Sequence, residues 1–149
     1  MTNQMTVIFD AVTDNEAFAR NTVAAFCVGL DPTVDQINDI KTAVSEAVTN
    51  CIVHAYPNKD KREEISISTS IDDNSVHIVI SDTGIGIEDI EAAKQPFFTT
   101  KPMEERSGMG FTVMESFMDS ITVERNEPSG TVIRMTKIIR GADWKEKKR

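Results

Sequence analysis

Hydrophobic residues recur with a helical period through residues 33–55. Their i, i+3, i+4 spacing places them along one stripe of a helix, which would pack against the rest of the protein. Thr33 followed by Gln36 forms a capping-box pattern, and Asp31-Pro32 is a dipeptide that commonly precedes a helix start. We therefore expect the longest helix of the chain to begin near residue 33. Its apolar stripe consists of Val34, Ile37, Ile40, Val44, Ala47, Val48, Cys51 and Ile52.

Apolar and polar residues alternate in five other stretches, which is the period of a half-buried strand. Turn residues separate the second stretch from the third and the fourth from the fifth, so these four predict two hairpins. The stretches are residues 5–11, 65–71, 76–80, 121–125 and 131–138, with turns at 72–75 and 126–130.

Two further helices are expected, one before and one after the long helix. Thr13 with Glu16 forms a second capping-box pattern, a helical period follows over residues 18–28, and Gly29 is suited to end that helix. The period returns at residues 110–118. We therefore predict three main helices and five strands.

Residues 83–107 break both periods with two glycines, two prolines and mixed charges, and only residues 88–94 suit a short helix there. A connection this long inside a compact domain is more often functional than idle. Helices gathered early and hairpins gathered late indicate an α+β fold, a two-layer α/β sandwich with a mixed, mostly antiparallel sheet and helices on one face. We expect one domain over residues 1–140, then a charged tail over residues 141–149 that is solvated or contacts a partner.

Composition excludes several classes of protein. The 149 residues are enough to bury a sizeable core in one domain without disulfides. The net charge of -8 argues against direct binding to nucleic acid or an anionic membrane, because proteins bind these partners mainly through Lys and Arg. No apolar run approaches the roughly 20 residues of a membrane helix, and the N-terminus shows no basic region followed by an apolar core, the pattern of a signal peptide. We expect a cytoplasmic protein.

Two cysteines, Cys27 and Cys51, both fall in apolar helical stretches. Their spacing is not that of metal ligands, so we interpret them as reduced core residues. Reactive thiols are the alternative interpretation.

Two groups of residues could carry chemistry in the first two thirds of the chain. Glu46 and Asn50 lie one helical turn apart, which places an acid and an amide at the border of the core unless the pair sits on a solvated flank. Asp82 follows a predicted strand, and Gly84 and Gly86 allow a tight turn with close approach of the backbone to a ligand. The Asp82 carboxylate could accept a hydrogen bond from an exocyclic amine. The same pattern also occurs in plain turns.

Two further positions lie nearer the C-terminus. Ser107, Gly108, Met109 and Gly110 directly precede a predicted helix, where free backbone N–H groups and the helix dipole favour an anion such as a phosphate. The alternative is an N-cap serine with flexible glycines. Thr131 places a hydroxyl on an apolar strand face, where it needs a ligand or a backbone partner. Neither a dinucleotide fingerprint nor a Gly-x4-Gly-Lys-Ser/Thr loop is present, so the usual nucleotide motifs are excluded.

Taken together and in this order, these positions resemble the N, G1 and G2 boxes of the GHKL ATPases. Within that superfamily, the runs SEAVTN, PFFTTKP and ERSGMGFTVMESFMD look most like the anti-sigma F factor family of spore-forming bacteria, whose members are small serine kinases. The resemblance covers nearly the whole chain apart from its last residues. The boxes are Glu46-x-x-x-Asn50, Asp82-x-Gly84-x-Gly86 and Gly108-x-Gly110.

The resemblance implies a Bergerat-type sandwich that holds ATP between its sheet and a mobile lid at residues 87–106. It implies that Asn50 coordinates Mg²⁺, that Glu46 is the general base and that Asp82 binds the adenine amino group. By the same resemblance, Gly84 and Gly86 would shape the adenine pocket, Ser107 to Gly110 would hold the phosphates, and Thr131 would help bind adenine. Lys101 or Arg106 would either approach the γ-phosphate or remain solvated lid charges.

The resemblance also implies a function and partners. The protein would inhibit a sporulation sigma factor, phosphorylate a serine of an anti-anti-sigma factor, and form a homodimer. One alternative is a non-catalytic module that uses ATP only to set its shape while it sequesters a transcription factor. Another is the ATP domain of a histidine kinase, although such enzymes carry a separate phosphoacceptor segment and His54 and His77 here read as structural.

Overall fold

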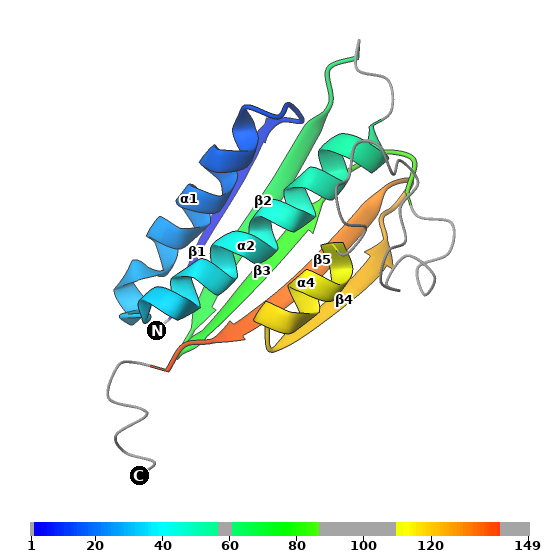
Figure 1. The fold of residues 1–149 in the computed structure, drawn as a ribbon. Helices are drawn as coiled ribbons and strands as arrows, with labels where there is room; N and C mark the ends of the chain where they lie inside the picture. Colours follow the sequence, from blue (N-terminus) through cyan, green and yellow to red (C-terminus); the bar gives the residue numbers. More distant parts are fainter. Residues whose placement is uncertain (1, 57–60, 87–109, 141–149) are drawn as a thin grey trace.

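A computed structural model describes residues 2–56, 61–86 and 110–140, which form one layer of helices on one layer of strands (Figure 1). The elements, in chain order, are β1 (Thr2–Asp10), α1 (Asn15–Cys27), η1 (Val28–Leu30), α2 (Val34–Asn50), η2 (Cys51–Ala55), β2 (Glu64–Asp72), β3 (Ser75–Ser81), α4 (Gly110–Phe117), β4 (Ser120–Arg125) and β5 (Thr131–Ile138).

The five described strands form one sheet in the order β1-β2-β3-β5-β4, and all four neighbouring pairs are antiparallel. Both predicted hairpins are present. The first closes where Asp72 pairs with Ser75, and the second opens from the pair of Arg125 with Thr131. The prediction of a mostly antiparallel sheet is therefore confirmed.

The helices α1, α2 and α4 cover one face of this sheet (Figure 1). Alternation along β2 buries its isoleucines beneath the helices, while its serines, on the opposite face, are half-exposed. Fully burying one large aliphatic side chain stabilises a fold by about 1.5–3 kcal/mol, so this interface holds the two layers together. Its most buried members are Ile40, Val44, Val48, Ile65, Ile67, Val76, Ile78, Ile80, Met114 and Met135.

Helix α2 begins where the sequence predicts. The Gln36 backbone N–H donates to Thr33 Oγ1 at 3.1 Å, and the Thr33 N–H donates to Gln36 Oε1 at 2.9 Å, which completes the capping box. After Asn50 the chain stays helical as the π-helical turn η2, which ends at Ala55. The predicted helix over residues 33–55 is therefore present, but its last turn is wider than an α-helix.

The prediction for the ends of α1 is wrong. Asp14 is the N-cap residue and makes no side-chain cap hydrogen bond, while the Glu16 carboxylate pairs with Arg20 one turn later. At the other end, α1 gives way to η1, and Asp31 rather than Gly29 takes the left-handed conformation, with φ of 53°. A short polar side chain makes Asp one of the few residues other than Gly that tolerate that conformation.

The predicted helix at residues 110–118 is confirmed as α4. The expected helix at residues 88–94, the lid at 87–106 and the tail at 141–149 lie outside the described residues. Within the part that the structure describes, no helix has both the length and the apolar composition to span a bilayer.

Candidate functional site

Four segments meet at one end of the sandwich. At the opposite end, Lys137 Nζ donates to the Asp39 carboxylate at 3.1 Å and to the Phe117 carbonyl at 2.6 Å, which joins the first half of α2 to the last residue of α4. From there α2 runs toward Asn50, and the first turn of α4 lies away from Lys137. The end of α2, the end of β3, the start of β5 and the start of α4 therefore lie together (Figure 1).

Asp82 is the central residue of this region. It directly follows β3 and is 4% exposed. Its Oδ1 accepts hydrogen bonds from the backbone N–H of Gly84 at 3.0 Å and of Thr131 at 3.2 Å, and its own N–H donates to the Thr131 carbonyl at 3.0 Å. Burial raises the pKa of Asp82, although these two N–H donors and the Cys51 thiol act in the opposite direction. The carboxylate is thus fixed in orientation but poorly solvated.

Cys51 connects the helical layer to this carboxylate. The Cys51 Sγ donates to Asp82 Oδ2 at 3.4 Å, so the first residue of η2 contacts the residue that follows β3. Burial raises the pKa of the Cys51 thiol well above its ordinary range, and burial raises that of Cys27 to about 11. Both cysteines are free and buried, as the sequence predicts.

Residues 82–86, here called the β3 corner, pack closely against the end of η2. A Cβ on Gly84 would lie 2.2 Å from the Ala55 carbonyl oxygen, which itself accepts a hydrogen bond from the Ile85 N–H at 3.0 Å. Gly86 has φ of 78°, a conformation that L side chains rarely adopt. Gly84 therefore allows a close approach between two parts of the protein's own backbone, while the approach to a ligand that we expected there stays a prediction.

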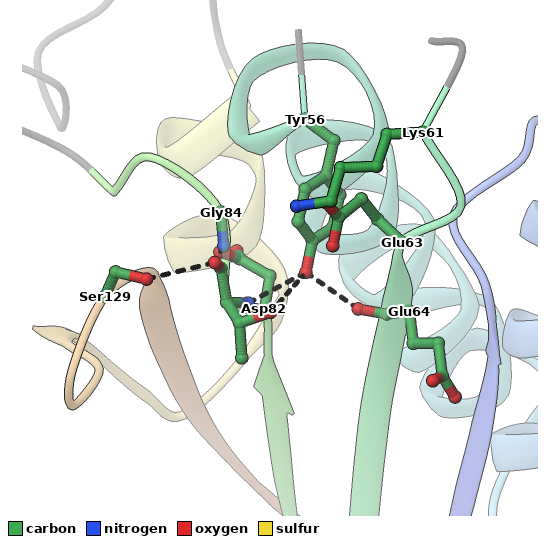
Figure 2. A network of polar contacts seen from close by, with 8 residues as sticks. Tyr56, Lys61, Glu63, Glu64, Asp82, Gly84 and Ser129 are labelled. Carbon is green, nitrogen blue, oxygen red and sulfur yellow. Dashed lines mark hydrogen bonds and ion pairs between the residues drawn. The ribbon is translucent and has the colours of Figure 1, made fainter. Parts of the chain in front are cut away.

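Tyr56 fixes the β3 corner from the helical side. Its hydroxyl donates to the Glu64 carbonyl at 2.8 Å and accepts the Thr83 N–H at 2.8 Å (Figure 2). Burial is the largest cause of a raised pKa at Tyr56, which keeps the hydroxyl protonated and able to donate. No motif in the sequence identifies Tyr56, whose only signal is that it is a large aromatic side chain in an otherwise polar loop.

The turn between β4 and β5 fixes the β3 corner from the other side. Asn126 Nδ2 donates to the Asp82 carbonyl at 2.8 Å. Ser129 Oγ donates to the Thr83 carbonyl at 3.1 Å (Figure 2). The sequence predicts this turn but gives no sign that its side chains bond to residues more than 40 positions away. These contacts hold the backbone of the β3 corner from a second side.

Asn50 and Glu46 lie on the helix that borders this region, and both side chains are half-buried rather than on a solvated flank. Asn50 Nδ2 is shielded from solvent and has no hydrogen-bond partner within the described ranges. Such an atom is uncommon in native proteins, where a water, an ion or a ligand usually completes the bonding. Rotation of the terminal amide would present its oxygen at the same place.

Of the four predicted phosphate-binding residues, only Gly110 lies within the described part of the chain. Gly110 is buried and begins α4, whereas Ser107, Gly108 and Met109 lie outside the described residues. Thr131 is 6% exposed and begins β5 beside Asp82. The structure therefore brings Asn50, the β3 corner, Thr131 and the start of α4 to one end of the molecule.

Comparison with known proteins identifies the family of this chain. The family model of the histidine kinase-like ATPase domain matches residues 9–137. Anti-sigma F factors are 55% identical in Geobacillus kaustophilus over 93% of this chain and 94% of that protein, and 51% identical in Bacillus subtilis over 92% and 93%. Another, from a Thermoanaerobacter species, is 56% identical over 95% and 97%.

The fold is also that of a solved structure. The RsbU and RsbW domains of Rv1364c from Mycobacterium tuberculosis match with a TM-score of 0.66 and 16% identity, over 92% of this chain and 32% of that one. The predicted GHKL-type sandwich is therefore confirmed. With the family model and the relatives above, the chain belongs to the anti-sigma F factor family of histidine kinase-like ATPase domains.

Proposed function

We propose that this protein is an anti-sigma factor that is also a serine kinase. It binds and inhibits a sporulation sigma factor, and it phosphorylates a serine of an anti-anti-sigma factor with Mg-ATP. The family and the names of its relatives support the sigma-factor role. The observation that carries the kinase role is the meeting of three groups at one end of the sandwich. They are a buried carboxylate, an amide nitrogen with no hydrogen-bond partner among the described residues, and a helix start.

The adenine end of the proposed site is the β3 corner. Asp82 Oδ1 is occupied by two backbone N–H groups, which leaves Oδ2 to accept a hydrogen bond from the adenine amino group. Gly84 and Gly86 keep the corner tight, and Thr131 adds a hydroxyl at the start of β5. These groups fit a purine that carries an amino donor.

The phosphate end is formed by α2 and α4. Asn50 supplies one hard oxygen ligand for Mg²⁺, which usually keeps several waters and phosphate oxygens as its other ligands. The bound ion supplies charge neutralisation for phosphoryl transfer. Backbone N–H groups at Ser107 to Gly110 hold the phosphates, favoured by the dipole of α4. These local donors allow a protein of net charge -8 to bind an anion.

Glu46 acts as general base in this proposal. It precedes Asn50 by one helical turn, so its carboxylate projects to the same side as the amide that holds the ion. Phosphoryl transfer needs in-line placement and a group that accepts the proton of the attacking hydroxyl. Glu46 takes that proton from the partner's serine. The lid at residues 87–106, with Lys101 and Arg106, covers the phosphates.

Substitution of the base tests the kinase assignment. Glu46→Gln should abolish phosphoserine formation on the anti-anti-sigma factor, while the ATP affinity measured by calorimetry stays within about twofold. Glu124→Gln is the matched control, because Glu124 is exposed and pairs only loosely with Arg134 at 3.6 Å. Normal phosphate transfer by Glu46→Gln would show that Glu46 is not the general base.

The remaining alternatives predict different results. Stable binding of the sigma factor with no phosphate transfer to any partner would favour the non-catalytic module. Phosphate that is labile in acid would favour phosphohistidine chemistry. The proposal also includes a cytoplasmic homodimer that contacts neither nucleic acid nor membrane directly, which sedimentation and binding assays with the purified protein would check.

A further inference from the structure

The carboxylate of Asp82 has two oxygens in different situations. Oδ1 accepts two backbone hydrogen bonds, from Gly84 and Thr131. Within the described residues, Oδ2 has one partner, the Cys51 thiol, with Sγ and Oδ2 3.4 Å apart. Because an ionised carboxylate oxygen can accept about two hydrogen bonds, Oδ2 retains a free site for a ligand donor. Cys51 therefore contacts the very oxygen that the proposed function assigns to adenine.

The thiol is well suited to hold that oxygen. Cys51 is 2% exposed and lies in the junction of α2 with η2, where its backbone N–H donates to the carbonyls of Ala47 and Val48. Its position is thus set by the helix rather than by a flexible loop. Burial keeps the thiol protonated, and a thiol is a weak donor, so it orients the carboxylate without neutralising it.

We infer that Cys51 is a positioning residue for purine recognition, because its thiol holds Asp82 Oδ2 in the orientation that accepts a 6-amino group. The inference rests on the proposed function and adds to it a residue that determines base specificity. A 6-oxo purine would direct an acceptor at this fixed oxygen and would be rejected. A 6-amino purine would complete its bonding.

A purely structural role for Cys51 predicts different behaviour. A core thiol that only fills space would affect all nucleotides equally when removed, through the shape of the pocket. A thiol that acts through Asp82 would affect only a nucleotide with a 6-amino group. Cys27 provides the matched control, since it is equally buried and has no thiol hydrogen bond among the described residues.

The binding test uses two triphosphates that differ only in the 6-amino group, ATP and purine riboside triphosphate. Cys51→Ala should weaken ATP by about two- to tenfold, the range for one lost hydrogen bond, and should leave purine riboside triphosphate unchanged. Cys51→Ser should restore most of the ATP affinity, because its hydroxyl also donates. Cys27→Ala should change neither affinity. Equal losses for both triphosphates in Cys51→Ala would overturn the inference.

An infrared measurement tests the contact without any nucleotide. The S–H stretching bands of the two cysteines are assigned by their loss in Cys51→Ala and Cys27→Ala. The Cys51 band should lie at lower frequency, since donation weakens the S–H bond, and Asp82→Ala should move it toward the Cys27 band. A Cys51 band at the Cys27 frequency would overturn the inference. If the wild-type protein shows the shifted band but binds neither triphosphate, the proposed function fails instead.

Discussion

Asp82 is an acid that the fold keeps almost out of water. Its carboxylate has three protein donors, two from backbone and one from a thiol, and burial still raises its pKa. An ionised group in that position is unfavourable for stability unless its partners compensate fully. A buried carboxylate whose pKa is raised is typical of a functional site.

Replacement of Asp82 by Asn should lower the affinity for ATP but raise the stability of the fold. In Asp82→Asn, the amide oxygen can still accept the Gly84 and Thr131 N–H groups, while its NH₂ group meets the adenine amino donor. ATP affinity should fall about ten- to hundredfold, the value of a hydrogen bond to a charged group. The unfolding free energy at pH 7 should rise, because a buried charge is removed. Calorimetric titration and urea unfolding measure the two effects.

The gain in stability from Asp82→Asn should depend on pH. Because the folded protein raises the pKa of Asp82 above the ordinary value of about 3.9, the folded state binds the proton more tightly than the unfolded state. The unfolding free energy of the wild-type protein therefore falls as pH rises from the pKa of Asp82 in the unfolded state to its pKa in the folded state. The variant has no carboxyl group at this position and lacks that loss. The difference between the two proteins should be small near pH 4 and should widen toward neutrality. A difference that narrows with rising pH would contradict this account.

At the scale of single elements, α2 carries Glu46 and Asn50, and its start is fixed by the capping box. Thr33→Ala removes one half of the observed capping box and should lower the unfolding free energy by about 1 kcal/mol. Thr13→Ala is the matched control, since Thr13 belongs to the predicted capping box that the structure does not form. It should change stability by less than about 0.5 kcal/mol. Urea unfolding of both variants measures these changes, and equal losses would contradict the assigned caps.

Lys137 joins three elements at the end opposite the site. Its side chain is 13% exposed and bonds to Asp39 on α2 and to the last carbonyl of α4. Lys137→Met keeps the apolar stem but loses both bonds, and we expect a loss of about 1–2 kcal/mol in unfolding free energy. Arg134→Met on the same strand is the control, because Arg134 is 54% exposed on the other face. A similar loss in both variants would show that Lys137 does not couple the elements.

For the molecule as a whole, most elements follow from local pattern. The period of 3.6 residues located α2 and α4, and alternation located all five strands, because each element buries one side and exposes the other. The end of α1 did not follow. Gly29 satisfies the usual rule for a helix end, but an extra turn of 3₁₀ helix moves the left-handed residue to Asp31. Which residue takes the left-handed conformation depends on how the chain after α1 must turn to reach α2.

Part of the candidate site could be predicted from the sequence, because some of its residues lie in local motifs. Glu46, Asn50 and Asp82 belong to short motifs that can be read locally. The contacts of Cys51 and Tyr56 with the β3 corner join residues 27 to 31 positions apart, and no local pattern encodes them. Long-range hydrogen bonds of this kind exist only once the sheet and helices have packed. They are also what makes the corner rigid.

One small substitution tests that rigidity across the molecule. Gly84→Ala would place a Cβ 2.2 Å from the Ala55 carbonyl, so η2 and the β3 corner must move apart. We expect a loss of about 1–3 kcal/mol in unfolding free energy, as for overpacked cores, with loss of ATP binding. Gly29→Ala is the matched control, since nothing lies within 4 Å of its added Cβ, and it should leave both properties nearly unchanged. If Gly84→Ala binds ATP normally in calorimetry, close contact between η2 and the β3 corner is not required for nucleotide binding.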